Sequence, residues 1–362
     1  MSDQLPTRQG GASSFNLQCP IPINDYPAIT LAHGGGGRLT QMLIDRMFVP
    51  AFGPQPGGGH DGAMFSLAAG DRGRLAFSTD SFVVSPRFFP GGDIGSLAVH
   101  GTVNDLAMCG ARPLALSVAF ILEEGLPMDE LWRIVRSLSR AAEDASVSVV
   151  TGDTKVVERG KGDGLYINTS GIGVIPPGIE ITPSRARAGD LVLINGPIAQ
   201  HGIAIMSVRE GLTFETTVQS DSAPLHNLVA GVLAAAGEQV HVLRDPTRGG
   251  LSSTLNEIAG QAKVGVRLNE SSIPINEEVR GACEILGLDP LYVANEGKCL
   301  LIVARESGDT VLAALRRHPL GREAAIIGEV VADHPGRVVM RSRIGGQRIV
   351  DMLSGEQLPR IC

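Results

Sequence analysis

The sequence has few aromatic side chains, and it lacks several features that mark common classes of protein. Aromatic residues make up only 4% of the 362 residues, so the hydrophobic 43% is mainly aliphatic. The five cysteines include no CxxC pair and no Cys/His pair with zinc-ligand spacing, and their odd number argues against a disulfide framework. A disulfide-stabilised secreted module and a structural zinc domain are therefore excluded.

Charge and hydropathy exclude two further classes. The net charge is −7 and the basic residues do not cluster, so no surface for nucleic acid or for an anionic membrane is predicted. No segment is long and apolar enough to cross a bilayer, and residues 1–14 lack the apolar core of a signal peptide. We therefore expect a reduced cytoplasmic protein that binds neither nucleic acid nor membrane.

Two widespread nucleotide-binding signatures are also missing. The sequence has no GxxxxGK followed by Ser or Thr, because Gly297-Lys298 lacks both the upstream glycine and the hydroxyl residue. No GxGxxG follows a predicted strand. A nucleotide site in this chain must therefore be built in another way.

The patterns that are present predict an α/β protein, because aliphatic runs alternate with helical spacing and glycine-rich turns. The clearest helix spans 127–145. The apolar run 114–122 predicts a strand covered on both faces. Prolines 176, 177 and 183 mark a domain boundary. The predicted segments are a flexible N-terminal extension (1–28), an N-terminal domain (29–178), a C-terminal domain (179–337) and a C-terminal tail (338–362).

Single carboxylates recur where predicted strands or glycine turns end. Each alone is most simply a turn or cap residue, but four in one half of the chain favour a site for a hard cation and phosphate, since Mg²⁺ prefers oxygen ligands. The four are Asp61, Asp80, Asp105 and Asp153.

Glycine-rich segments and two charged residues fit the same chemistry. The run Gly34–Gly37 and the segment 245–250 (DPTRGG) each lead into a predicted helix, where free N–H groups bind anions; flexible hinges are the alternative. Lys155 could neutralise phosphate or a developing oxyanion. Glu296 precedes a buried strand and could act as a base if its surroundings raise its pKa.

The last residue of the chain is a cysteine, Cys362. A reduced cysteine at the end of a mobile tail is a nucleophile limited by its thiolate fraction, and an incidental exposed thiol is the alternative. Residues 351–362, when extended, reach roughly 40 Å. The thiol could therefore enter a pocket on its own subunit or on a neighbour.

At these residues the sequence resembles the HypE family of hydrogenase-maturation carbamoyl dehydratases. The resemblance runs from LAHGGGGRL near residue 31 to the terminus, through FSTDSFVV, GTVNDLAM, VTGDTKVVERG, DPTRGGL and ANEGK. The terminal PRIC is its most specific mark, whereas motifs such as GDT occur across the aminoimidazole ribonucleotide synthetase (PurM-like) superfamily. Two departures are the N-terminal extension and His60-Asp61, where the superfamily often has an acidic pair.

The resemblance implies a PurM-like two-domain fold in which the N-terminal domain binds ATP and Mg²⁺ and pairs its sheet with that of a second copy in a homodimer. It further implies that the S-carbamoyl group on Cys362 is dehydrated to thiocyanate at the expense of ATP, with Lys155 and Glu296 acting on the tail. A HypF-like carbamoyltransferase would be the donor, and a HypC–HypD-like iron scaffold would accept cyanide for nickel–iron hydrogenase. The implied metal positions are Asp61, Asp80, Asp105 and Asp153, and the implied nucleotide positions are Gly35, Gly36, Asp80, Asn104, Asp153, Thr154, Asp245 and Thr247.

Two other interpretations stay open at this point. One is a relative such as selenophosphate synthetase or a small-molecule kinase, although Cys19 is followed by Pro20 rather than by the Gly and Lys of a selenophosphate synthetase. The other is a non-catalytic scaffold that binds nucleotide and uses Cys362 only to dock partners. ATP hydrolysis that depends on a modified tail separates these from a dehydratase.

Overall fold

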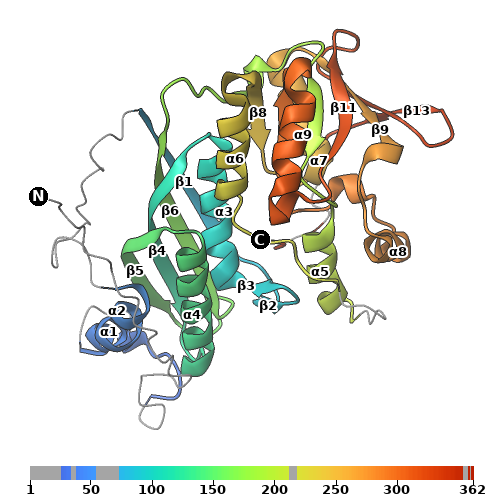
Figure 1. The fold of residues 1–362 in the computed structure, drawn as a ribbon. Helices are drawn as coiled ribbons and strands as arrows, with labels where there is room; N and C mark the ends of the chain where they lie inside the picture. Colours follow the sequence, from blue (N-terminus) through green and yellow to red (C-terminus); the bar gives the residue numbers. More distant parts are fainter. Residues whose placement is uncertain (1–25, 34–37, 54–72, 212–217, 354–357, 359) are drawn as a thin grey trace, which may run out of the picture.

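Two β-sheets, one in each half of the chain, organise the fold (Figure 1). The computed structural model describes the chain except for residues 1–25, 34–37, 54–72, 212–217, 354–357 and 359. Helices and strands are mixed in both halves, so the predicted α/β class is confirmed. The flexible extension predicted for 1–28 lies almost entirely outside the described residues.

The N-terminal sheet has four strands in the order β1-β6-β4-β5, and only β4 and β5 are parallel. One face packs against two helices, which lie in front of the sheet in Figure 1. The carboxylate of Asp93 accepts hydrogen bonds from the N–H groups of Gly95 and Ser96 and begins the first of them, as its position in the sequence predicts. The elements are β1 (Arg74–Phe82), β4 (Arg112–Glu123), β5 (Ser148–Val157), β6 (Leu165–Ile175), α3 (Ile94–Met108) and α4 (Met128–Asp144).

The opposite face of this sheet is not covered by the described part of the chain. Leu75 is 58% exposed, Phe77 72% and Ile121 44%, because alternate residues of a strand point to opposite faces. The prediction that 114–122 is covered on both faces is therefore wrong for a single chain. The run is nearly continuously apolar, yet alternate side chains face outward.

Small elements border the N-terminal sheet. The ring of Phe48 stacks on that of Phe120 from β4, with 5.5 Å between centroids, and so attaches a short helical segment to the covered face. These elements are α1 (Arg38–Leu43), a π-helical turn (Ile44–Phe48), α2 (Val49–Phe52), β2 (Phe88–Phe89) and β3 (Gly92–Asp93).

The C-terminal sheet has seven strands in the order β13-β12-β9-β11-β7-β10-β8, and helices cover both faces. Helices α6 (His226–Ala236) and α9 (Gly308–Arg317) pack on one face, and α5 (Gln200–Arg209), α7 (Gly250–Ala262) and α8 (Glu277–Leu286) on the other. The strands are β7 (Leu191–Ile194), β8 (Val240–Arg244), β9 (Gly265–Asn269), β10 (Leu300–Val303), β11 (Ala325–Val331), β12 (Val338–Arg341) and β13 (Gln347–Val350).

The C-terminal tail begins later in the structure than the sequence predicts. The sequence places it at residue 338, but β12 pairs with β9 and β13 pairs with β12, so the chain leaves the sheet only after Val350. Val338, Met340 and Val350 are buried. Strands of four residues are too short for their alternation to stand out in the sequence.

The two halves meet along α3. Ala107 and Met108, at its end, belong to the hydrophobic core that α6 and α9 form with the C-terminal sheet. Asn104 is buried in this junction: its amide donates to the carbonyls of Ala223 and Glu296, both at 3.1 Å. Among the helices of the described residues, none has the length and apolar character needed to cross a membrane.

Candidate functional site

The end of the chain lies in the junction between the two halves (Figure 1). The N–H of Val83 donates to the terminal backbone oxygen of Cys362 at 3.1 Å, and the N–H of Ser85 donates to the carbonyl of Arg360 at 3.2 Å. The side chain of Ile361 between them is 2% exposed and packs in the N-terminal core. The terminal residues are therefore bound mainly through their backbone.

Cys362 lines a pocket of about 270 Å³ beside the loop that leads into α7. Arg248 of the DPTRGG segment contributes to the wall. Gly250 has φ +58°, and a Cβ there would lie 2.6 Å from the Leu291 carbonyl oxygen, so only glycine fits. This close backbone contact holds the loop, and with it Arg248, against the tail.

Four carboxyl groups lie in the junction near the docked tail. Asp80 lies on the helix-covered face of the N-terminal sheet, Asp105 on α3, Asp245 just after β8, and Glu296 before β10. Burial, followed by the charges of Asp245 and Asp80, raises the pKa of Asp105 to about 7, although the Ser78 hydroxyl donates to it at 2.6 Å. Burial also raises the pKa values of Asp80 and Asp245. Burial is the main cause of all three shifts, because it disfavours the charged form of a carboxyl group.

Glu296 and Cys362 share this environment. Burial and then the charges of the neighbouring aspartates raise the pKa of Glu296 well above its usual range. Its side chain is almost fully buried, and Oε1 has no hydrogen-bond partner among the described residues. Burial and then the Glu296 charge raise the pKa of the Cys362 thiol to about 12. The docked thiol is thus held in its neutral form beside a buried carboxyl group whose Oε1 has no hydrogen-bond partner among the described residues.

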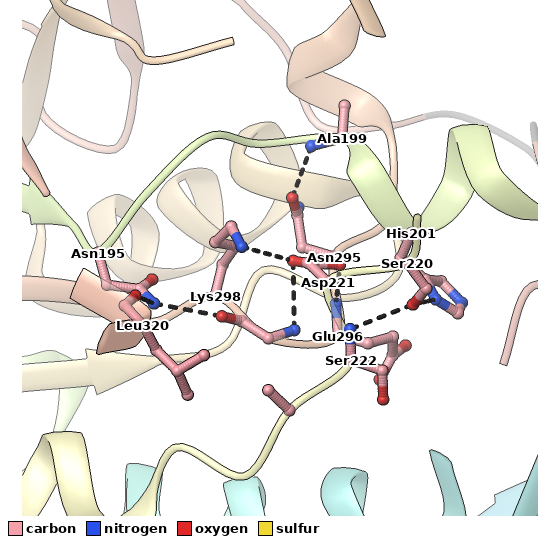
Figure 2. Close-up of polar contacts among 12 residues, drawn as sticks. Asn195, Ala199, His201, Ser220, Asp221, Ser222, Asn295, Glu296, Lys298 and Leu320 are labelled. Atoms are coloured by element: carbon pink, nitrogen blue, oxygen red, sulfur yellow. Dashed lines mark hydrogen bonds and ion pairs between the residues drawn. The ribbon is translucent and has the colours of Figure 1, made fainter. Parts of the chain in front are cut away.

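A buried ion pair supports the backbone that carries Glu296 (Figure 2). Asp221 accepts from Lys298 Nζ at 3.0 Å and from the N–H groups of Glu296 and Gly297 at 3.2 and 3.3 Å. Burial alone would raise the pKa of Asp221, but the charge of Lys298, the neighbouring His201 and the hydrogen bonds to the carboxylate together outweigh it, and the pKa lies below its usual value. Asn295 also anchors the backbone next to Glu296, because its Oδ1 accepts a hydrogen bond from the N–H of Ala199 at 2.7 Å.

Two domain models match this architecture. The AIR synthase related protein N-terminal domain matches residues 59–175, and the corresponding C-terminal domain matches 187–341. The carbamoyl dehydratase HypE of Cupriavidus necator is 55% identical to the chain over 353 residues, which cover 97% of this chain and 99% of that protein. The chain belongs to the HypE family.

Solved structures agree with this assignment. A crystal structure of a HypE in complex with ATP has a TM-score of 0.87 and 51% identity, and the match covers 92% of this chain and 99% of that one. A crystal structure of a HypE–HypF complex matches with a TM-score of 0.75 and 44% identity, over 88% of this chain and 100% of that one.

Within this HypE-family chain, the predicted site residues fall into three groups. Cys362, Glu296, Asp80, Asp105 and Asp245 lie together, with Asn104 supporting the Glu296 carbonyl. Thr247 lies in the same loop as Asp245, where its carbonyl accepts from the N–H of Gly250 at 2.9 Å. Gly35, Gly36 and Asp61 lie outside the described residues.

The third group lies elsewhere. Asp153 and Lys155 are inside β5 rather than after it, on the open face of the sheet, while Thr154 between them points to the covered face. Lys155 Nζ contacts Asp153 Oδ1 at 2.7 Å, and both side chains are largely exposed. Within one chain they do not join Asp80 and Asp105. No three His, Cys, Asp or Glu side chains in the described ranges are arranged to hold a metal ion.

Three supporting residues, Asp221, Lys298 and Arg248, have no role in the sequence analysis of this HypE-family member. Asp221 stands in QSDSAPL, a polar turn without a known motif, so nothing local signals its burial. Arg248 and Lys298 do belong to the motifs DPTRGGL and ANEGK. Each is the basic residue of its motif, and that feature could have marked it as a supporting residue.

Proposed function

We propose that the protein dehydrates a carbamoyl group on the sulfur of Cys362 to a nitrile, with consumption of ATP, and so supplies cyanide for the maturation of nickel–iron hydrogenase. The observation that carries this proposal is the position of Cys362 in a pocket beside Glu296 and Arg248. The names of the family members and the ATP complex of a relative support the reaction and the co-substrate.

The chemistry requires activation of a poor leaving group. The oxygen of the thiocarboxamide attacks the γ-phosphorus of ATP, an O–P bond forms, and ADP leaves. The C–O bond then breaks and phosphate leaves, and the nitrogen loses two protons as the C≡N bond forms, one to Glu296 and the other to the departing phosphate. Glu296 takes up an N–H proton, because its buried carboxylate is a stronger base than an exposed one and its Oε1 is free. Docking of the tail supplies proximity.

We propose that a divalent cation binds at the carboxylate cluster together with ATP. Mg²⁺ is commonly held by one or two carboxylates and by substrate phosphates, so Asp80, Asp105 and Asp245 would need to supply only part of its ligands. Asp61 is proposed as a further ligand. When bound, Mg²⁺ neutralises charge on the phosphates during transfer. Thr247 and the backbone of Gly35 and Gly36 are proposed to contact the nucleotide.

A homodimer would explain why Asp153 and Lys155 lie away from the other predicted site residues of their own chain. We propose that the open face of the N-terminal sheet, with Leu75 and Phe77 exposed, packs against the same face of a second copy. Lys155 would then act on the tail, and Asp153 on metal and phosphate, in a site completed by both copies. The proposed partners in turnover are a HypF-like carbamoyltransferase, supported by the HypE–HypF relative, and a HypC–HypD-like iron scaffold in the cytoplasm.

The decisive experiment follows the mass of the C-terminal peptide. The protein is incubated with the carbamoyltransferase, carbamoyl phosphate and Mg-ATP, and endoproteinase Glu-C then releases residues 357–362 by cleavage after Glu356. We expect gain of one carbamoyl group on Cys362 followed by ATP-dependent loss of one water. Cys362→Ser should abolish both changes, whereas Cys109→Ser, at an exposed cysteine, should preserve them. Carbamoylation without water loss would leave a carrier but no dehydratase.

A further inference from the structure

His201, the second residue of α5, is a buried side chain that contacts the backbone of the docked tail next to Cys362. The ring is fully buried and packs edge-on against Phe89, with 5.5 Å between centroids. Nε2 lies 2.7 Å from the carbonyl oxygen of Ile361, and Nδ1 lies 2.8 Å from the hydroxyl of Ser220. Figure 2 shows His201 beside Ser220, next to the segment that supports Glu296.

The contacts determine the tautomer of the ring. A carbonyl oxygen can only accept, so Nε2 carries the proton and donates to Ile361, and Nδ1 accepts from the Ser220 hydroxyl. That hydroxyl in turn accepts from the N–H of Ser222 at 3.1 Å. Every member of this chain of hydrogen bonds points in one direction, from Ser222 to the tail.

The position of the ring complements the backbone contacts on the other side of the tail. The carbonyl of Arg360 and the terminal backbone oxygen of Cys362 accept from Ser85 and Val83, and the carbonyl between them is bonded by His201. The His201 side chain thus donates to the Ile361 carbonyl a hydrogen bond of the kind that a neighbouring strand donates in a sheet. The tail also lies close to the next residue of α5, since a Cβ added to Gly202 would lie 3.2 Å from Leu358 Cδ1.

The same segment connects the ring to the catalytic junction. Ser220 and Ser222 flank Asp221, whose carboxylate bonds the N–H groups of Glu296 and Gly297. Ser222 also contacts His100 Nδ1 on α3 at 2.9 Å. Residues 220–222 therefore link His201 to the backbone of Glu296 through hydrogen bonds, and His201 fixes the tail relative to that segment.

We propose that His201 is a positioning residue that holds the C-terminal tail docked, through the hydrogen bond from its Nε2 atom to the carbonyl of Ile361. The role rests on the proposed function, in which the tail must be docked for Cys362 to react. It concerns docking alone, however, and can be measured without the partner or ATP.

The measurement is the rate at which iodoacetamide alkylates Cys362 in the native full-length protein, read from the peptide 357–362 after Glu-C digestion. Docking buries the thiol and raises its pKa to about 12, so alkylation reports the undocked fraction. His201→Phe keeps the ring volume but removes the donor, and loss of this buried bond should raise the rate about tenfold. His201→Gln retains an amide donor at the position of Nε2 and should restore slow alkylation.

A matched control separates positioning from loss of stability. His241 is also a buried histidine of the C-terminal half, hydrogen bonded to Asp190 at 2.8 Å and not to the tail. His241→Phe should leave the alkylation rate unchanged. A rate unaffected by His201→Phe, or an equal rise in the His241 control, would overturn the proposal.

A milder variant tests the same role if His201→Phe does not fold. Ser220→Ala removes the hydroxyl that fixes the tautomer and should raise the alkylation rate about threefold, in proportion to one weakened hydrogen bond. An unchanged rate would contradict the proposal. Failure of the dehydratase function is a separate result, because it appears as carbamoylated wild-type protein that loses no water while the alkylation rates still differ.

Discussion

The ammonium group of Lys298 lies 3.0 Å from the carboxylate of Asp221, and both side chains are nearly inaccessible to solvent. The pair stands directly behind Glu296, since Asp221 also bonds the N–H groups of Glu296 and Gly297. A Cβ at position 297 would lie 1.8 Å from the Asp221 carbonyl oxygen, so the two segments approach as closely as glycine allows. A buried ion pair thus holds the backbone that carries Glu296.

Removal of one partner of this pair should cost more than removal of both. Lys298→Met leaves the Asp221 charge buried without its cation and should lower the free energy of unfolding by about 3 kcal/mol. Adding Asp221→Asn to Lys298→Met should recover part of that loss, because no unpaired charge remains. Urea denaturation of both single variants and the double variant measures the coupling. Additive losses would show that the two charges do not stabilise each other.

Substitution of the base should separate catalysis from tail loading. Glu296→Gln preserves shape but cannot take up a proton, so the ATP-dependent loss of water should slow by about 100-fold or more. Carbamoylation of Cys362 should continue at the wild-type rate. Mass spectrometry of the C-terminal peptide measures both steps. Glu278→Gln, at an exposed carboxylate on α8, is the control and should change neither. Undiminished water loss in Glu296→Gln would remove this residue from the mechanism.

The carboxylate cluster should make stability depend on pH. The pKa of Asp105 is about 7 in the folded protein and near its ordinary value of 3.8 when unfolded. Between these values the native state binds more protons, so this group lowers the free energy of unfolding progressively as pH rises from about 4 to about 7. Asp105→Asn should therefore stabilise the protein at pH 8 relative to pH 5, by about 2 kcal/mol.

Denaturant titrations at the two pH values measure this difference. Asp153→Asn is the matched control, because the hydrogen bond from Lys155 holds the pKa of Asp153 below its usual value. It should show no gain at pH 8. Equal stabilisation of Asp105→Asn at both pH values would contradict the raised pKa.

The open face of the N-terminal sheet should control assembly. Phe77→Asp places a charge at the centre of the proposed dimer interface and should convert the protein to a monomer in sedimentation velocity experiments. Ile344→Asp, at a 97% exposed apolar residue between β12 and β13, should leave assembly unchanged. A dimer that persists in Phe77→Asp would place the interface elsewhere.

Elements with long periodic patterns could be predicted from the sequence, and short ones could not. Residues 127–145 read as a helix because Leu131, Ile134 and Leu138 recur on one face, and these residues are buried in α4. β12 and β13 contain too few residues for such a pattern, so they were included in the tail. The open sheet face was missed because an apolar run does not say whether both of its faces are covered.

Some residues of the candidate site could likewise be predicted from the sequence, and others could not. The motifs containing Asp80, Asp105 and Glu296 pointed to residues that the fold does gather around Cys362. Asp153 stands in an equally suggestive motif but faces the other side of the sheet, because spacing along the chain does not fix which face a strand residue occupies. The role of Asp221 could not be predicted, because it depends on contacts between residues that are far apart in the sequence.

The docked tail is hydrogen bonded through the backbone oxygens of residues 360–362, and the side chain of Ile361 is buried in the N-terminal core. These hydrogen bonds are made to backbone atoms, so they do not depend on what the sulfur of Cys362 carries. The sulfur faces a pocket of about 270 Å³, so a group attached to it meets the pocket wall while the backbone stays bound. Anchoring of the tail and recognition of the group that it carries are therefore separate tasks, performed by different atoms of the same three residues.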